Sequence, residues 1–274
     1  MLRSKFFMVG AVTALAIILL SVFSPLIVQY SPVTNSLKEK LLSPEYFSRN
    51  LNGHVFGTDN LGRDIFTRLL LGSRYSLLIA FTVVGAASVI GTILGAISGY
   101  FGGWLDTIIM RFCDVMMAIP NLVMAIAVMA ILGANMYNLI IVLIITSWVQ
   151  YCKVTRNNVM VVKNIEFVQA SKVLGANRWH IMFSQIFPNV TTQLIILISQ
   201  QIGWTILTEA SLSFLGLGIQ PPTPSWGNMI ADGRNYLITS PWIVFVPGFA
   251  LMVTVLAFNF LGDGLRDVLD PKRI

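Results

Sequence analysis

The sequence predicts an all-α membrane protein, a polytopic bundle of six transmembrane helices. Only 11% of its 274 residues are charged, whereas an ordinary soluble domain has about 25%. A spanning helix needs roughly 20 apolar residues to cross ~30 Å of hydrocarbon, and in lipid a helix satisfies its own backbone amides. The charges are bunched and leave five long uncharged stretches, at 6–37, 75–105, 115–152, 179–208 and 235–262.

These stretches hold six expected spans. The stretch at 115–152 is too long for one helix and is interrupted at 133–138, so it divides into two. Residues 100–106 are expected to form a turn, and Pro120 to kink the start of the third span. The spans are predicted at about 6–28, 77–99, 116–132, 138–157, 190–212 and 242–262.

The division of the chain follows from these spans. Residues 1–74 are expected to form the first transmembrane helix, an external loop and a short interfacial helix. Residues 75–274 are expected to form a five-helix core with a loop at 158–189. The apolar run near the N-terminus lacks a small-x-small cleavage site, so it is interpreted as a retained span.

Orientation follows from the distribution of Lys and Arg. With both termini in the cytoplasm, 11 of the 18 basic residues lie inside and seven outside. This arrangement places loop 158–189 in the cytoplasm. It also explains the net charge of +6 without a nucleic-acid partner. Cys113 and Cys152 fall near cytoplasmic span ends, where a disulfide is not expected.

The segment before the second span has its own pattern. Thr58 or Asp59 can cap a turn, and His54 is expected to be a surface residue rather than a metal ligand. From Asp64 the apolar spacing becomes helical, with Asp64 and Arg68 placed as an i, i+4 ion pair. We therefore expect a short helix on the outer membrane surface that leads into span two.

Small residues mark the second span. Gly91, Gly95 and Gly99 repeat every four residues. Within lipid, such spacing allows the backbones of two helices to approach closely. The pattern does not identify the partner helix.

Residues 166–189 mix charged, small and apolar residues at helical spacing. Phe167, Ala170, Ser171 and Leu174 fall on one helical face, and Gly175 permits a bend because it tolerates positive φ. A second helical run follows until Pro188 ends or kinks it. We interpret the segment as a docking surface for another protein, and an amphipathic loop lying on the membrane is the alternative. Three basic residues surround it: Lys163, Lys172 and Arg178.

Glu209 is the only acid within an otherwise apolar fifth span. Ionisable groups at membrane depth are costly and commonly face a bundle interior or a water-filled path. Glu209 is therefore a candidate for the translocation pathway. The alternative is a hydrated residue at the helix end, or one paired with Arg234 or Arg74.

The segment at 169–188 resembles the cytoplasmic Glu-Ala-Ala loop of bacterial ATP-binding-cassette (ABC) importer permeases, a motif that continues with three residues, Gly, nine residues and Ile-x-Leu-Pro. Ala170, Gly175 and Pro188 match this spacing. The departures from it are Gln169, Ser171, Gln185 and Phe187.

Two other motifs support the resemblance. Gly-Thr-Asp-x-Leu-Gly-Arg-Asp at 57–64 and Leu-Gly-Asp-x-Leu-Arg-Asp-x-Leu-Asp-Pro at 261–271 are similar to stretches of the dipeptide/oligopeptide/nickel family of these permeases. The three motifs occur in the family's order. The resemblance implies a type I ABC importer permease fold, in which the docking segment is the ATPase-coupling loop. Its expected site residues are Glu166, Phe167, Gln169, Ala170, Ser171, Leu174, Gly175 and Pro188.

The resemblance also implies an assembly in the bacterial cytoplasmic membrane. The expected partners are a homologous second permease subunit, two ATP-binding subunits that carry ATP and Mg, and an extracytoplasmic solute-binding protein. The implied substrates are peptides or nickel and other metal chelates. An ion-driven secondary carrier or channel is the main alternative, and a membrane scaffold is a third.

Enzymatic chemistry in this chain is not expected. The sequence has no Gly-x-x-x-x-Gly-Lys-[Ser/Thr] phosphate loop, no His-Glu-x-x-His and no Gly-x-Ser-x-Gly. Its two isolated histidines, His54 and His180, suggest no metal-ligand set. We therefore expect no catalytic residues, no metal site and no cofactor in this chain.

Overall fold

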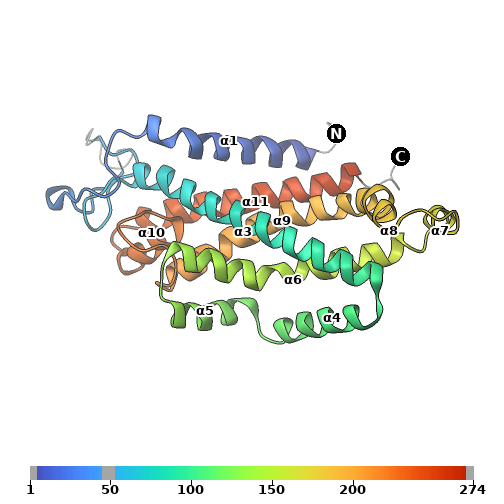
Figure 1. The fold of residues 1–274 in the computed structure, drawn as a ribbon. Coiled ribbons are helices and arrows are strands. Elements are labelled where there is room, and N and C mark those ends of the chain that lie inside the picture. The colour runs from blue at the N-terminus through green and yellow to red at the C-terminus, as the bar shows by residue number, and fades with distance from the viewer. Residues whose placement is uncertain (1–4, 45–52, 270–274) are drawn as a thin grey trace.

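Long helices that run side by side make up most of the molecule (Figure 1). The computed structural model describes residues 5–44 and 53–269. Its helices are α1 (Lys5–Ile27), η1 (Leu37–Glu39), α3 (Ile65–Phe101), α4 (Gly103–Met117), α5 (Asn121–Leu132), α6 (Met136–Val162), α7 (Glu166–Val173), α8 (Arg178–His180), the π-helix η2 (Ile181–Ile186), α9 (Phe187–Phe214), α10 (Trp226–Gly233), η3 (Arg234–Tyr236) and α11 (Trp242–Leu269).

The all-α membrane fold is confirmed. Within the described ranges, five helices are long and apolar enough to cross a membrane: α1, α3, α6, the continuous run Arg178–Phe214, and α11. The pair α4 and α5 is apolar enough for a sixth crossing when the two helices are taken together, but they meet at an 83° bend.

The prediction of one straight spanning helix at 116–132 is therefore wrong. The helix α5 has 12 residues, or about 18 Å at 1.5 Å per residue, which is too short to cross alone. Pro120 stands immediately before α5, as expected of a residue that lacks an amide proton. The turn predicted over 100–106 is also shorter than expected, because α4 already begins at Gly103.

The predicted interfacial helix after Asp64 does not exist as a separate element. These residues open α3, which runs 37 residues without a break, so the boundary drawn between residues 74 and 75 falls inside a helix. The first turns of α3 are buried rather than spread on a membrane surface. Ile65 is 0% exposed, and Gly72 lies against the backbone of Ser225 before α10.

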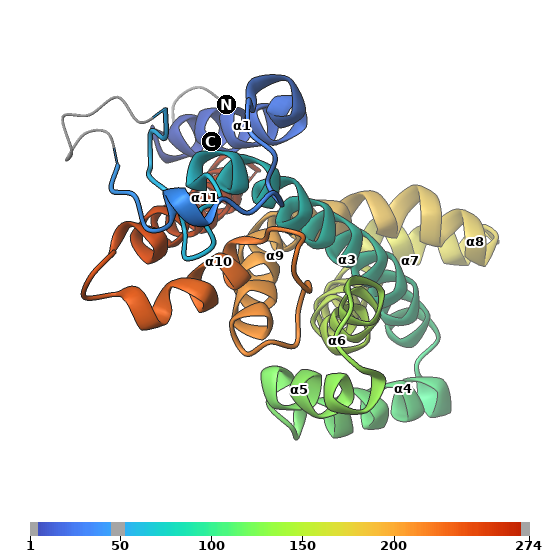
Figure 2. The same cartoon turned by 90° about the vertical axis from the view of Figure 1, so that its left-hand side faces the viewer.

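The partner of the glycine-rich face of α3 is α6. A Cβ at Gly91 would lie 2.6 Å from Cβ of Tyr151, and a Cβ at Gly95 would lie 2.8 Å from Cβ of Thr155. Real Cβ atoms do not approach this closely, so any larger residue would push the helices apart. Close packing over this length joins α6 to α3 (Figure 2), and α3 in turn contacts α1, α4 and α9.

The helix α1 packs on the outside of the bundle, along α11 (Figure 2). Small residues again permit the contact from both sides. A Cβ on Gly10 would lie 2.5 Å from the Leu261 amide nitrogen, and one on Gly264 would lie 2.5 Å from Cα of Phe7. The first span is thereby attached to the last one.

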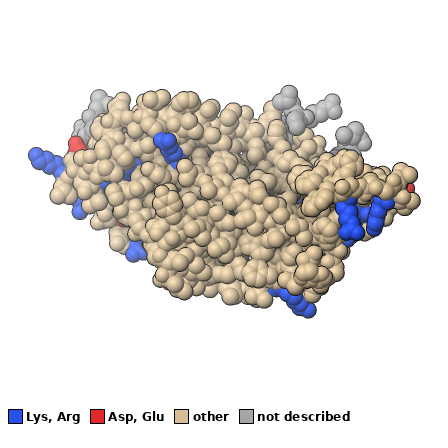
Figure 3. Space-filling model, in the orientation of Figure 1, with Lys and Arg blue, Asp and Glu red and all other residues tan. Residues whose placement is uncertain are grey.

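The two ends of the bundle differ. The helix α7 projects from one end, where α1 begins and α11 finishes, and α10 lies at the other end (Figure 1). On the face shown in Figure 3, charged side chains gather towards these ends and leave a broad uncharged band between them. An uncharged band is what a helix bundle presents to hydrocarbon.

A buried ion cluster holds the α10 end together. Arg63 Nε lies 2.7 Å from Asp59 Oδ2, and Arg63 Nη2 lies 3.2 Å from Asp232 Oδ2 at the end of α10. Arg68, 2% exposed, lies 3.5 Å from the same Asp59 oxygen. The cluster joins the loop before α3 to the end of α10 across 169 residues of sequence.

Three predictions for this region meet different outcomes. Asp59 caps the turn, because its Oδ1 accepts from the amides of Leu61 and Arg63. The prediction of an Asp64–Arg68 ion pair is wrong, since Asp64 instead caps α3 by accepting from the Thr67 amide. The prediction of a surface His54 is also wrong: it is 3% exposed, and its Nδ1 lies 2.9 Å from Asp64 Oδ1.

Candidate functional site

The helix α7 is the projecting part of the docking segment. It begins at Glu166, three residues after the Lys163 cap of α6, with no side chain capping its amides. Val168 is 3% exposed and belongs to a cluster with Val162 of α6 and Ile181 and Ile186 of η2. This single buried side chain attaches α7 to the bundle.

The other face of α7 is apolar and open. Phe167 is 47% exposed and Leu174 is 87% exposed, and Ala170 between them is also exposed. Ser171 was predicted on this face but is half-buried, because its hydroxyl accepts from Gln185 Nε2 at 2.7 Å. An exposed cluster of large apolar side chains at the tip of a molecule is typical of a protein–protein contact.

The turns on either side of α7 are held by specific backbone contacts. Gln169 Nε2 donates to the Lys163 carbonyl at 2.8 Å and so braces the turn from α6. Gly175 ends the helix with φ of 82°, and a Cβ placed there would meet nothing within 4 Å. The predicted glycine bend is confirmed, and it depends on backbone conformation rather than on space.

Pro188 does not end the helix, so the first of the two outcomes predicted for it is wrong. The run Arg178–Phe214 continues through it as one span, and Pro188 is the second residue of α9. The six residues before α9 form the π-helix η2. Such a widened turn is a recognised way to accommodate a proline that can neither donate an amide nor clear the preceding carbonyl.

A polar groove lies between α5, α6 and α9, in otherwise apolar helices. The polar residues that line it are Asn121, Thr146, Ser147, Gln150, Gln201, Thr205 and Thr208, and Trp204 stands among them, 58% exposed. Gln201 Nε2 donates to Gln150 Oε1 across the groove. Its volume of about 50 Å³ holds a few water molecules. A solute would need α6 and α9 to separate.

Sequence reasoning missed this groove, although a signal was present. Thr146 and Gln150 are four residues apart, and Gln201, Thr205 and Thr208 follow at i, i+4 and i+7. Each set therefore marks one polar stripe on an apolar helix. Only the packing of α6 against α9 shows that the two stripes face each other.

Glu209 lies deep inside the bundle. It is 0% exposed, its Oε2 accepts from the Ser76 hydroxyl of α3 at 3.0 Å, and its Oε1 accepts from Ser213 at 2.7 Å. Both alternatives considered from the sequence are therefore wrong: Glu209 is neither hydrated at a helix end nor paired with Arg234 or Arg74. The carboxylate links α9 to α3, and its place in a pathway stays a prediction. Over the described ranges, no group of three or more His, Cys, Asp or Glu side chains is arranged to hold a metal ion.

The bundle, its polar groove and its projecting apolar helix together define a polytopic membrane protein of the transport type. The family comparison agrees with this class. Residues 91–274 match the model of the binding-protein-dependent transport system inner membrane component, and residues 1–44 match that of the N-terminal TM domain of oligopeptide transport permease C. The chain belongs to the family of binding-protein-dependent transport system inner membrane components.

Relatives resemble the chain over most of its length. A glutathione transport system permease protein of Pectobacterium atrosepticum is 45% identical over 81% of this chain and 73% of its own. A dipeptide transport system permease protein of Alkalihalophilus pseudofirmus is 40% identical over 98% of this chain and 87% of its own. An oligopeptide transport system permease protein of Bacillus subtilis is 39% identical over 98% of this chain and 86% of its own.

A solved structure shares the fold. The crystal structure of an amino acid ABC transporter with histidines aligns with a TM-score of 0.59 over 74% of this chain and 95% of that chain. At 14% identity, this likeness supports the helix arrangement alone.

Proposed function

We propose that this chain is the permease subunit of an ABC importer, forms half of a translocation pathway, and is driven by separate ATPase subunits through α7. The observation that carries the proposal is the open apolar face of α7, which projects from the bundle on a single buried anchor. Family membership and the named functions of the relatives support it.

The connections of α7 supply a mechanism. One end of α7 joins α6 through a three-residue turn, and the other end joins the Arg178–Phe214 span through Gly175. These are the two long helices that line the polar groove. A displacement of α7 by ATPase closure therefore pulls directly on both walls of the groove, as alternating access requires.

Peptides are the substrate class that we propose. The polar side chains that line the groove are neutral amides and hydroxyls, which can donate to and accept from peptide groups. The relatives are named for dipeptide, oligopeptide and glutathione transport. Nickel or metal chelates, the alternative from the sequence, are tested by offering them in the same uptake assay.

The remaining parts of the proposal concern the assembly. The α7 end and both termini face the cytoplasm of a bacterium, where two ATP-binding subunits carry ATP and Mg. A homologous permease subunit completes the pathway, and an extracytoplasmic solute-binding protein docks at the α10 end. The excess of Lys and Arg on the α7 side supports this orientation.

The test is to remove the apolar tip. The double variant Phe167→Ser/Leu174→Ser should insert normally but lose co-purification of the ATPase subunits and ATP-dependent peptide uptake in proteoliposomes. The control for ATPase co-purification is Ile238→Ser, since Ile238 is 96% exposed at the α10 end, away from α7. Normal ATPase recovery in the double variant would refute the docking role. Uptake driven by an ion gradient without ATP would instead support a secondary carrier.

A further inference from the structure

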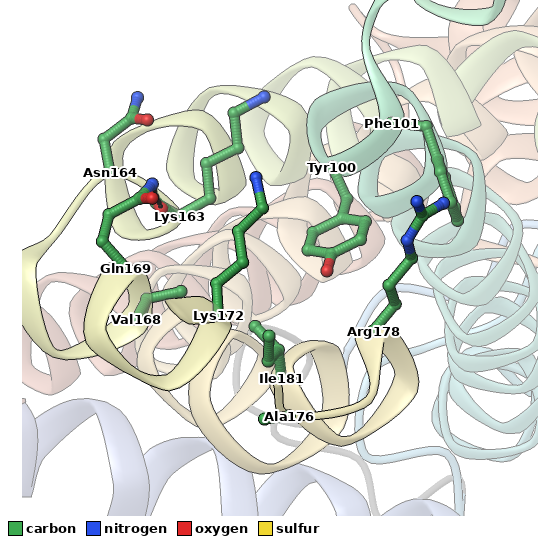
Figure 4. Close-up of a pocket in the computed structure, with 10 residues that line it drawn as sticks. All are labelled: Tyr100, Phe101, Lys163, Asn164, Val168, Gln169, Lys172, Ala176, Arg178 and Ile181. Atoms are coloured by element: carbon green, nitrogen blue, oxygen red, sulfur yellow. Dashed lines mark hydrogen bonds between the residues drawn. The ribbon is translucent and has the colours of Figure 1, made fainter. Parts of the chain in front are cut away.

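A cavity of about 400 Å³ opens beside α7, where α3 and α6 end. Lys163, Lys172 and Arg178 line it together with Tyr100 and Phe101 (Figure 4). The three cations come from three elements, the end of α6, the end of α7 and the start of α8. The fold therefore concentrates positive charge that is dispersed in the sequence.

Within the described residues little negative charge offsets these cations, because Asp106, the acid that interacts with Lys163, binds Arg156 through both of its carboxylate oxygens. No acidic residue lines the cavity, and within the described residues neither the Lys172 ammonium group nor the Arg178 guanidinium group forms an ion pair or hydrogen bond. Lys163 is the exception, because its Nζ donates to the Gly99 carbonyl at 2.6 Å. That bond holds one ammonium group at the cavity wall and leaves two of its protons available.

The position of Arg178 points to an anion. It is the first residue of the helical run Arg178–Phe214, the fourth of the five long spans. A helix N-terminus carries partial positive charge, so a cation placed there is unfavourable unless a negative group lies nearby. An anion in the cavity would interact with Arg178, the helix end and the two lysines at once.

The surroundings of the cavity favour a lipid as the source of that anion. Phe101 is 43% exposed at the end of α3, and Trp104 at the start of α4 is 71% exposed. Exposed aromatic side chains at span ends are typical of the membrane–water interface. Above Phe101, an apolar stripe with Ile90 and Ile93 continues along α3, and both residues are exposed. Acyl chains could lie on this stripe while the headgroup enters the cavity.

We propose that this cavity binds the phosphate of an anionic phospholipid headgroup. Basic pockets between spans at the cytoplasmic side are suited to such headgroups. The lipid would tie the end of α3 to the α7–α8 corner. The proposal goes beyond the transport function and does not depend on which protein contacts the outer face of α7.

The test measures lipid binding to the assembled transporter by native mass spectrometry. The purified complex is titrated with phosphatidylglycerol, with phosphatidylcholine, and with inorganic phosphate as a competitor. The variant is Lys172→Gln/Arg178→Gln, and the control is Arg111→Gln/Arg266→Gln, which removes two exposed cations outside the cavity. Each basic residue near an anionic lipid contributes about fivefold in affinity, so the variant should bind phosphatidylglycerol about 30-fold more weakly.

The control should bind as wild type does, and phosphatidylcholine should bind weakly to all forms. Unchanged phosphatidylglycerol binding in the variant, or equal binding of both lipids to the wild type, would overturn the proposal. Displacement by inorganic phosphate would also overturn it, because the site would then serve a soluble anion. If the Lys172→Gln/Arg178→Gln variant lost the ATPase subunits but still bound phosphatidylglycerol, the cations would be assigned to protein docking and the proposal would be overturned. Failure of the Phe167 and Leu174 test leaves this lipid measurement unaffected.

Discussion

Replacement of Gly175 by alanine tests whether the angle of α7 matters for coupling. Gly175 has φ of 82°, and an added Cβ would meet no atom within 4 Å. The substitution therefore adds backbone strain without a clash. Gly85 provides a matched control, because it is also exposed with nothing within 4 Å of its Cβ position, but it lies inside α3.

The size of the effect follows from these conformations. An L-residue held in the left-handed region costs roughly 1–2 kcal/mol, and every 1.4 kcal/mol is about tenfold in an equilibrium. Gly175→Ala should therefore reduce the population of the docking-competent α7, and the apparent affinity for the ATPase, by about 5- to 30-fold. Gly85→Ala should have no such effect, because alanine is favoured over glycine within a helix.

The assay titrates purified ATPase subunits onto permease complexes in nanodiscs and follows ATP-dependent uptake in parallel. Gly175→Asn should lose less than Gly175→Ala, since asparagine tolerates the left-handed region. Wild-type ATPase affinity and uptake in Gly175→Ala would refute the reasoning that this bend sets the docking geometry. A loss that Gly85→Ala shares would show that the effect is not specific to the bend.

Three further predictions concern the interior. Gln150→Leu/Gln201→Leu removes a hydrogen-bonded pair from the groove and should lower peptide uptake about fivefold or more while ATPase co-purification is retained; unchanged uptake would exclude the groove from the pathway. Asp59→Asn leaves two buried arginines short of a counter-charge and should destabilise the complex by about 3–5 kcal/mol, measured as a lower Tm. Glu209→Leu strands two serine hydroxyls at about 1–3 kcal/mol each, whereas Glu209→Gln keeps an acceptor. The uptake rate of Glu209→Gln is divided by the amount of folded complex. A change in this rate would support a pathway role for Glu209, whereas an unchanged rate would leave only its role in linking α9 to α3.

The docking segment was largely predictable because its signals are local. Glu166 starts α7, and Gly175 takes the positive φ expected of it. The side chain that attaches α7 was not predicted, because Val168 is buried by contacts with η2 and α6 rather than by its own helix. Exposure of the remaining apolar face follows from that single anchor.

The errors in the prediction come from contacts between distant residues. Asp64 and Arg68 have the spacing of an ion pair, but each finds a stronger partner elsewhere, His54 for Asp64 and Asp59 for Arg68. An i, i+4 pair on a helix surface is worth only a few tenths of a kcal/mol. Buried partners with fixed geometry therefore override it. The same burial keeps the start of α3 within the bundle and off the membrane surface.

The sequence by itself determined that this protein is a bundle of membrane helices with an amphipathic helical segment, residues 166–189, between two of them. Those features depend on the number of apolar residues in a row and on backbone bonds that close within four residues. The tertiary structure alone decided which helices meet, and so where the groove lies. Gln150 meets Gln201 across 51 residues of sequence, and Arg63 meets Asp232 across 169. The glycines of α3 predict that another helix approaches closely, but they do not identify α6 as that helix, because the choice depends on packing between segments far apart in the sequence.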